Sequence, residues 1–117
     1  MLRYTAASAM NSREKLQEEL AECLKRGAGV AVVTVVAADF STPQGVGAKM
    51  LVYPDGRMSG TVGGGAVEAF VKKEAGEALK EEKPRLSEHR LVMSETGMYC
   101  GGKMTFFIEV YPPKSTI

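Results

Sequence analysis

Apolar residues recur at helical spacing in the first third of the chain, and charged residues fill the positions between them. The apolar stripe consists of Leu16, Leu20, Cys23 and Leu24. Asn11 and Glu14 have the spacing of a helix-capping pair, and Gly27 follows the last apolar position. We therefore predict an amphipathic helix from near Asn11 to Gly27, with Cys23 in its buried stripe, and we expect residues 1–10 to be frayed.

β-branched residues and alanine then form a nearly uninterrupted run over residues 30–36, which is typical of a strand covered on both faces. Shorter runs of the same kind predict strands over residues 50–53, 58–62 and 104–111, with a weaker candidate over residues 86–93. Asp55 and Gly56 supply a tight turn between the first two of these shorter strands.

A second helical stripe begins directly after Gly65 and ends near Pro84. Its apolar face consists of Val67, Phe70, Val71, Ala75, Ala78 and Leu79. The order helix, three strands, helix, two strands predicts an α+β fold with a mixed β-sheet of about five strands packed against two main helices. The 117 residues suit a single domain over residues 1–117.

Charge and composition exclude several classes of protein. Fifteen basic and fourteen acidic side chains give a net charge of +1 with no block of like charge, so nothing marks a nucleic-acid partner. The chain has no apolar run long enough for a signal peptide or a membrane span, and we expect a cytoplasmic protein. Cys23 and Cys100 form no Cys-x-x-Cys pair, so we expect neither a disulfide scaffold nor a protein cage for a metal ion.

Three consecutive glycines, Gly63, Gly64 and Gly65, lead into the second helix. The bare backbone and the helix N-terminus suit a phosphate or pyrophosphate, although such a turn can also serve only to bend the chain. Ala66 stands where a P-loop needs lysine, which excludes a Walker site. Glu68 either interacts with the helix dipole or accepts hydrogen bonds from a heterocycle above the turn.

Cys100 is followed by Gly101 and Gly102, which leave little bulk around its sulfur. The thiol is therefore open to chemistry or ligation, or it is a small apolar residue in a tight turn. His89, between Glu88 and Arg90, is expected to be an ordinary surface residue.

Taken together, these motifs resemble the N-terminal domain of the XdhC/CoxI family, the accessory factors of xanthine dehydrogenase, carbon monoxide dehydrogenase and related molybdenum hydroxylases. The resemblance covers most of residues 28–110. The matching segments are Ser41-Thr42-Pro43, residues 47–52, Asp55-Gly56, residues 60–68, and Cys100-Gly101-Gly102 leading to residues 107–109.

The resemblance implies a chaperone-like role toward the molybdenum cofactor, in its molybdopterin or dinucleotide form, and leaves open whether the protein is also an enzyme. The factor would hold the cofactor while sulfur from a cysteine desulfurase is installed, and would then help to insert it into a molybdenum hydroxylase client. The residues implied in cofactor binding are Ser41, Thr42, Lys49, Gly63, Gly64, Gly65, Glu68, Cys100, Gly101 and Gly102. The phosphate end would lie on the glycine turn, and Cys100 would meet the molybdenum or its dithiolene.

The chain departs from the family pattern in two ways. Phe40 stands where glycine is usual and Gln44 where arginine is usual, which removes a bidentate anion donor. We expect the C-terminal Rossmann-like domain of the family to be absent, and a separate subunit or a homodimer partner to replace it unless it is unnecessary. Two alternative functions stay open: a sulfurtransferase with a persulfide on Cys100, and a structural or regulatory partner domain that binds no cofactor.

Overall fold

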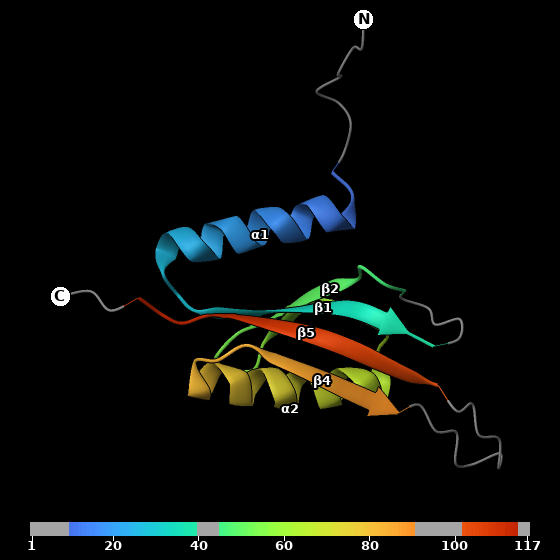
Figure 1. The fold of residues 1–117 in the computed structure, drawn as a ribbon. Coiled ribbons are helices and arrows are strands. Elements are labelled where there is room, and N and C mark those ends of the chain that lie inside the picture. Colours follow the sequence, from blue (N-terminus) through green and yellow to red (C-terminus); the bar gives the residue numbers. More distant parts are fainter. Residues whose placement is uncertain (1–9, 40–44, 91–101, 115–117) are drawn as a thin grey trace, which may run out of the picture.

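The computed structural model describes residues 10–39, 45–90 and 102–114. Two helices, α1 (Ser12–Arg26) and α2 (Gly65–Glu81), lie on opposite faces of one five-stranded sheet (Figure 1). The strands are β1 (Val30–Ala38), β2 (Lys49–Val52), β3 (Met58–Gly60), β4 (Arg85–Arg90) and β5 (Lys103–Tyr111). The predicted α+β fold with five strands and two main helices is therefore confirmed.

The strand order is β3-β2-β1-β5-β4, and every pairing is antiparallel, where the sequence analysis expected a mixed sheet. The reason lies in the crossover through α2. This helix joins β3 to β4, which run in the same direction, but the two strands lie at opposite edges with β2, β1 and β5 between them. The crossover therefore creates no parallel pair.

The central strand β1 is buried on both faces, as its apolar run predicted. Val30 and Val32 point toward α1, whereas Ala31, Val33 and Val35 point toward α2, as the alternation of a strand requires. Both predicted helical stripes are confirmed. The α1 stripe, with Cys23 fully buried, packs on Leu51 and Tyr53, and the α2 stripe packs on Phe106, Ile108 and Met104.

Helix α1 begins and ends as its sequence predicted. The side chain of Asn11 accepts a hydrogen bond from Glu14 N at 2.9 Å, and the Glu14 carboxylate accepts one from Asn11 N at 2.9 Å. At the other end Gly27 takes a left-handed conformation (φ 67°), which is cheap only for glycine. Lys114 N donates to Gly27 O at 2.9 Å, so the segment after β5 is held beside the end of α1.

Glu19 attaches α1 to the sheet. Its carboxylate accepts hydrogen bonds from the Tyr53 hydroxyl and from Ser59 Oγ, the latter at 2.7 Å. These two bonds lower the pKa of Glu19, and burial together with the bond to Glu19 raises the pKa of Tyr53. The Arg57 guanidinium lies 4.7 Å from the centre of the Tyr53 ring. One carboxylate thus links the helix to β3 and to the residue that follows β2.

A different network joins α2 to β4. Arg85 donates to three glutamates of the helix, Glu74 at 3.2 Å, Glu77 at 2.9 Å and Glu81 at 3.1 Å. Farther along β4, His89 is half-buried, with its ring centre 4.7 Å from that of Phe70 on α2. The expectation of an ordinary surface histidine was therefore wrong, because alternation in β4 turns this side chain toward α2.

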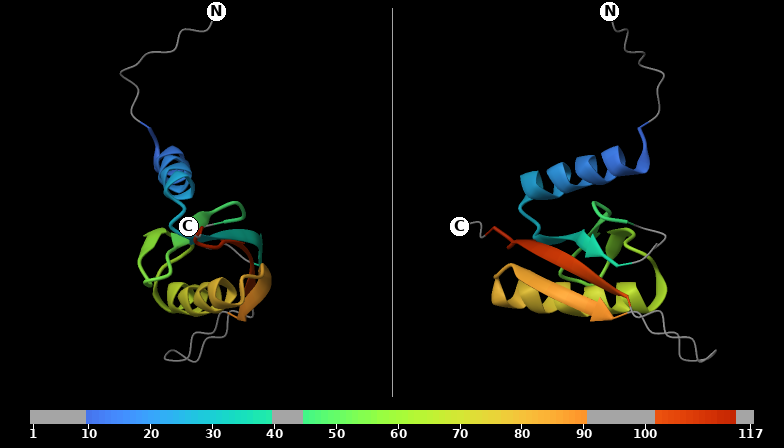
Figure 2. Two further views of the ribbon diagram at one scale, coloured as in Figure 1. Left: turned by 90° about the vertical axis from the view of Figure 1, so that its left-hand side faces the viewer. Right: turned by 45° about the vertical axis from the view of Figure 1, so that its right-hand side comes forward.

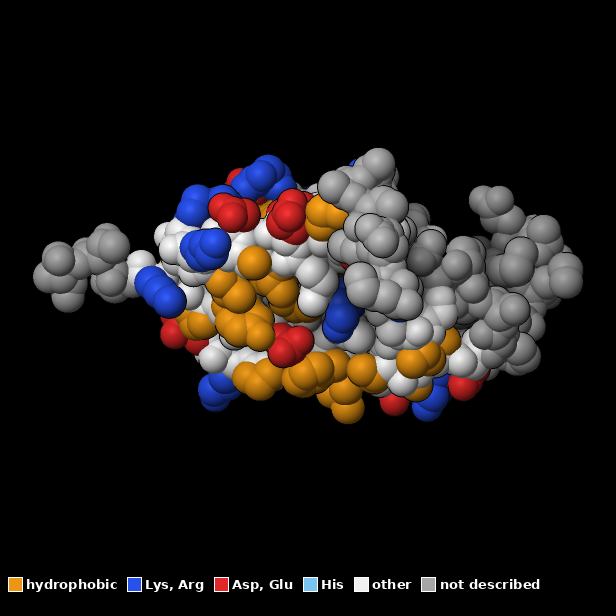
Figure 3. Space-filling model, turned by 90° about the horizontal axis from the view of Figure 1, so that it is seen from above, with side chains coloured by type: hydrophobic (Ala, Val, Ile, Leu, Met, Phe, Trp, Pro, Cys, Tyr) orange, Lys and Arg blue, Asp and Glu red, His pale blue; other side chains and the backbone are white. Residues whose placement is uncertain are grey.

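Helix α1 packs against β1, β2 and β3, which leaves apolar side chains exposed on the other half of the same face. Leu86 of β4 pairs with Phe107 of β5, and Tyr111 lies farther along β5 on the same face. Leu86 is 68% exposed. Figure 3 views the molecule from this side and shows hydrophobic side chains gathered on the surface.

Candidate functional site

One end of the sheet brings together Lys49, Gly102 and the triple-glycine turn. Asp39 N, just after β1, donates to Lys103 O at 2.9 Å, which places Gly102 beside the carboxyl end of β1. Lys49, the first residue of β2, pairs with Thr34, the middle residue of β1. The strands β3 and β4 also end here, and α2 begins here, as two views of the fold show (Figures 1 and 2).

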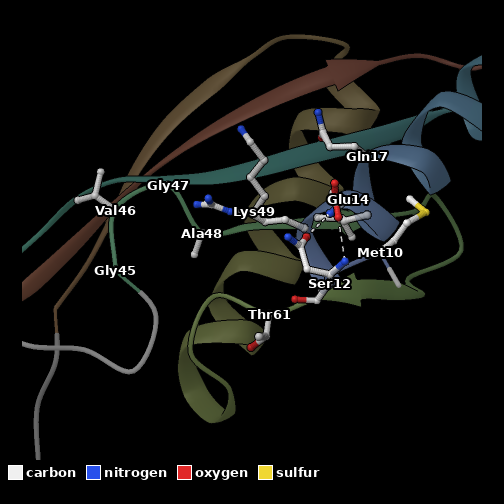
Figure 4. A pocket seen from close by; sticks show the side chains of 14 residues that line it. Met10, Ser12, Glu14, Gln17, Gly45, Val46, Gly47, Ala48, Lys49 and Thr61 are labelled. Carbon is white, nitrogen blue, oxygen red and sulfur yellow. Dashed lines mark hydrogen bonds between the residues drawn. The ribbon is translucent and has the colours of Figure 1, made fainter. Parts of the chain in front are cut away.

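An open groove of about 920 Å³ lies at this end, on the α1 side of the sheet. Its walls are the first turn of α1, residues 45–49 before and within β2, and Gly60 and Thr61 at the end of β3 (Figure 4). Lys49, one of the predicted cofactor-binding residues, lines it. Lys49 is half-buried, and its Nζ donates to Thr34 Oγ1 at 3.0 Å.

Arg13 of α1 also lines the groove and was not predicted from the sequence. Its guanidinium lies beside Gly47, with Nη2 3.5 Å from the position that a β-carbon would occupy on this glycine. Gly47 has φ +96°, a conformation that favours glycine. Nothing in the local sequence marks Arg13, because it lies among other charged residues on the polar side of its helix.

The triple-glycine turn is closed by side chains of the protein itself. Gly63, Gly64 and Gly65 all have positive φ, at 143°, 79° and 55°. Thr61 Oγ1 accepts a hydrogen bond from Gly63 N at 3.2 Å and donates to the Glu68 carboxylate, and the same carboxylate oxygen accepts from Gly64 N at 3.0 Å. An anion arriving at this turn would have to displace Glu68.

The glycine turn and the groove are separate features of the same end of the sheet. Thr61 belongs to both, whereas Gly63, Gly64, Gly65 and Glu68 do not line the groove. Of the other residues implied in cofactor binding, Gly102 is buried directly before β5. The remaining four lie outside the described residues. They are Ser41, Thr42, Cys100 and Gly101.

Within residues 10–39, 45–90 and 102–114, no group of three or more histidine, cysteine, aspartate or glutamate side chains is placed to hold a metal ion. No helix in that part of the chain combines the length and apolar character needed to cross a membrane.

The fold and site define a small α+β protein whose antiparallel sheet brings a lysine, a glycine turn and a cationic groove to one end. The chain belongs to the XdhC and CoxI family, whose model matches residues 23–96. The match includes Lys49 and the glycine turn and ends before Cys100.

Two similar proteins are considerably longer than this chain. An uncharacterized protein of Escherichia coli strain K12, YqeB, is 40% identical over 96 residues, which are 80% of this chain and 18% of YqeB. A crystal structure described as a xanthine dehydrogenase from Bacillus halodurans superposes with a TM-score of 0.66 at 23% identity, over 80% of this chain and 29% of that one. The second likeness shows a shared fold.

Proposed function

We propose that this protein is a maturation factor of a molybdenum hydroxylase, of the xanthine dehydrogenase or carbon monoxide dehydrogenase type. It holds the molybdenum cofactor while the terminal sulfur, delivered by a cysteine desulfurase, is installed, and it then assists insertion into the client. The observation that carries the proposal is that Lys49, Gly102 and the triple-glycine turn, which the family resemblance implies in cofactor binding, lie at one end of the sheet.

The residues at this end suit a cofactor of that chemistry. Molybdopterin carries a phosphate or a pyrophosphate, and Lys49 presents a cation beside a groove of about 920 Å³, within the size range of cofactor pockets. Gly102, another residue implied in cofactor binding, is buried beside Asp39 at the same end. When bound, the cofactor supplies the redox-active molybdenum, and the protein supplies binding, orientation and shielding from water.

The proposal is tested by co-expression with a xanthine dehydrogenase-type client in cells that lack other factors of this family. The purified chain is analysed for retained molybdenum, and the client for molybdenum content and hydroxylase activity. We expect Cys100→Ser to lower both cofactor retention and client activity. Cys23→Ala is the matched control, because the Cys23 thiol is fully buried and lies in the core under α1.

Unchanged retention and unchanged client activation by Cys100→Ser would overturn the assignment. A persulfide on Cys100 that forms with the desulfurase and without any retained molybdenum would identify a sulfurtransferase instead. A chain that binds no molybdenum and still activates the client would identify a regulatory partner domain.

A further inference from the structure

We propose that the groove between the first turn of α1 and residues 45–49 binds a phosphate or diphosphate group through Arg13 and Lys49. This assignment moves the anion site away from the triple-glycine turn, where the sequence alone would place it. It adds to the proposed function a residue, Arg13, that belongs to none of the motifs of the chain.

The glycine turn is the weaker candidate because two of its amides already have side-chain partners within the protein, and one of these partners is a carboxylate. The Glu68 carboxylate accepts from Gly64 N at 3.0 Å and from the Thr61 hydroxyl, and Thr61 Oγ1 accepts from Gly63 N. A phosphate bound there would displace the Glu68 carboxylate from its hydrogen bonds and would then lie close to it. Two negative charges at that distance repel each other, which is unfavourable.

The groove, by contrast, presents two cations from two different elements. Arg13 reaches it from α1 and lies beside Gly47, and Lys49 reaches it from β2. The partner of Lys49 is the neutral hydroxyl of Thr34, at 3.0 Å. Throughout the described part of the chain, neither Arg13 nor Lys49 takes part in an ion pair. Their positive charges are therefore uncompensated by a carboxylate in contact.

One acidic side chain, Glu14, also lines the groove. Its carboxylate is held by the backbone N–H of Asn11 at 2.9 Å as part of the capping box, so its position is fixed by the helix end. Two cations and one carboxylate leave a net positive charge, and the amino end of α1 adds a partial positive charge. The balance favours an anionic ligand.

The two cations have complementary roles toward phosphate. A guanidinium binds two oxygens of one phosphate through parallel N–H donors, and an ammonium acts as a point charge that accepts any orientation. The groove, at about 920 Å³, is larger than a phosphate ion and leaves room for an organic part of the ligand. The identity of that organic part rests on the proposed function, whereas anion binding by the two residues does not.

The test is a calorimetric titration of the full chain with inorganic pyrophosphate at fixed ionic strength. We expect Arg13→Gln and Lys49→Gln each to raise Kd about tenfold, as for the loss of one charged hydrogen bond. Lys49→Arg should keep most of the affinity. Arg26→Gln, at the other end of α1, and Lys72→Gln, on α2, remove the same charges elsewhere and should change Kd by less than about twofold.

Three results would overturn the assignment. The first is that pyrophosphate does not bind at millimolar concentration. The second is an equal loss of affinity in Arg13→Gln and Arg26→Gln, because equal losses indicate a diffuse electrostatic attraction and not a defined site. Tighter binding by Glu68→Gln would place the anion at the glycine turn instead. Circular dichroism of each variant confirms that it is folded before titration.

A second arm separates the source of the phosphate and keeps the two proposals distinct. ADP and purified molybdenum cofactor are titrated against the same variants. Both ligands should bind Arg13→Gln more weakly, since both carry phosphate groups. If neither ligand loses affinity in this variant, the assignment of the groove as the phosphate site is refuted. Pyrophosphate binding through Arg13 together with no effect on the client would leave the groove established and refute only the maturation role.

Discussion

Replacing Glu19 by alanine should destabilise the protein by about 2 kcal/mol. The change removes the acceptor of two hydrogen bonds, from the Tyr53 hydroxyl and from Ser59 Oγ. Tyr53 is only 6% exposed, so its hydroxyl would lose a partner without free access to water, at a cost of about 1–3 kcal/mol. The hydrogen bond from Ser59 Oγ contributes less because it is partly exposed to solvent, so the total is about 2 kcal/mol.

Thermal unfolding of the variant measures this loss. For a chain of 117 residues, about 2 kcal/mol corresponds to a fall in Tm of about 8 °C. Glu18→Ala is the matched control, because Glu18 is the exposed neighbour of Glu19 on the same helix and its replacement removes the same charge. We expect its Tm to stay within about 2 °C of the parent protein. Equal losses in the two variants would refute the role given to Glu19.

A double-mutant cycle and a pH series sharpen this test. Tyr53→Phe removes the donor together with its need for a partner, so Glu19→Ala should cost less in that background. The pKa of Glu19 is lowered in the folded protein from 4.5, so its stabilisation is complete above about pH 4.5 and is lost as the pH falls through the folded value. The stability difference between parent and Glu19→Ala should therefore shrink in acid, and a difference that grew there would contradict the assignment.

Three further predictions concern stability. Glu68→Gln should lower the free energy of unfolding by about 1 kcal/mol in denaturant titration, because Gly64 N loses a charged acceptor at the start of α2, and an unchanged midpoint would contradict this. Arg85→Ala should lower the midpoint of the same denaturant titration, because three helix glutamates lose their shared donor; an unchanged midpoint would show that the network is inert. Leu86→Ser should change stability by less than about 0.5 kcal/mol, whereas Phe106→Ala should cost about 3–5 kcal/mol, since only Phe106 is fully buried; similar values for the two would refute the assigned faces of β4 and β5.

Local patterns were enough to predict most of the secondary structure. The α1 stripe, its capping pair and the buried run of β1 each depend on residues close in sequence, and each is confirmed. The strand predicted over residues 58–62 is shorter in the structure, because β3 ends at Gly60 and Val62 enters the core beneath α2. Periodicity cannot show this, since a buried residue in a turn and one in a strand are equally apolar.

The candidate site was less predictable, because it depends on contacts between distant segments. Arg13 lies in the first turn of α1, and only the packing of that helix on the sheet brings it to Gly47. Glu68 was predicted to have one of two roles, and the sequence could not choose between them because both place a carboxylate in the first turn of α2. The geometry favours the structural role, since the carboxylate reaches back to Gly64 N.

The separation of the two ends of the sheet offers a way to observe the groove experimentally. Gly27 and Lys114 are joined by a hydrogen bond at the end where β1 begins, and Lys49 and Arg13 lie toward the end where β1 finishes. The nine residues of β1 span about 30 Å between the two ends. A surface tether or fluorophore introduced at Lys114 would leave the groove facing solution, so immobilised protein can be titrated with anions and client without blocking the end that carries Lys49 and the glycine turn.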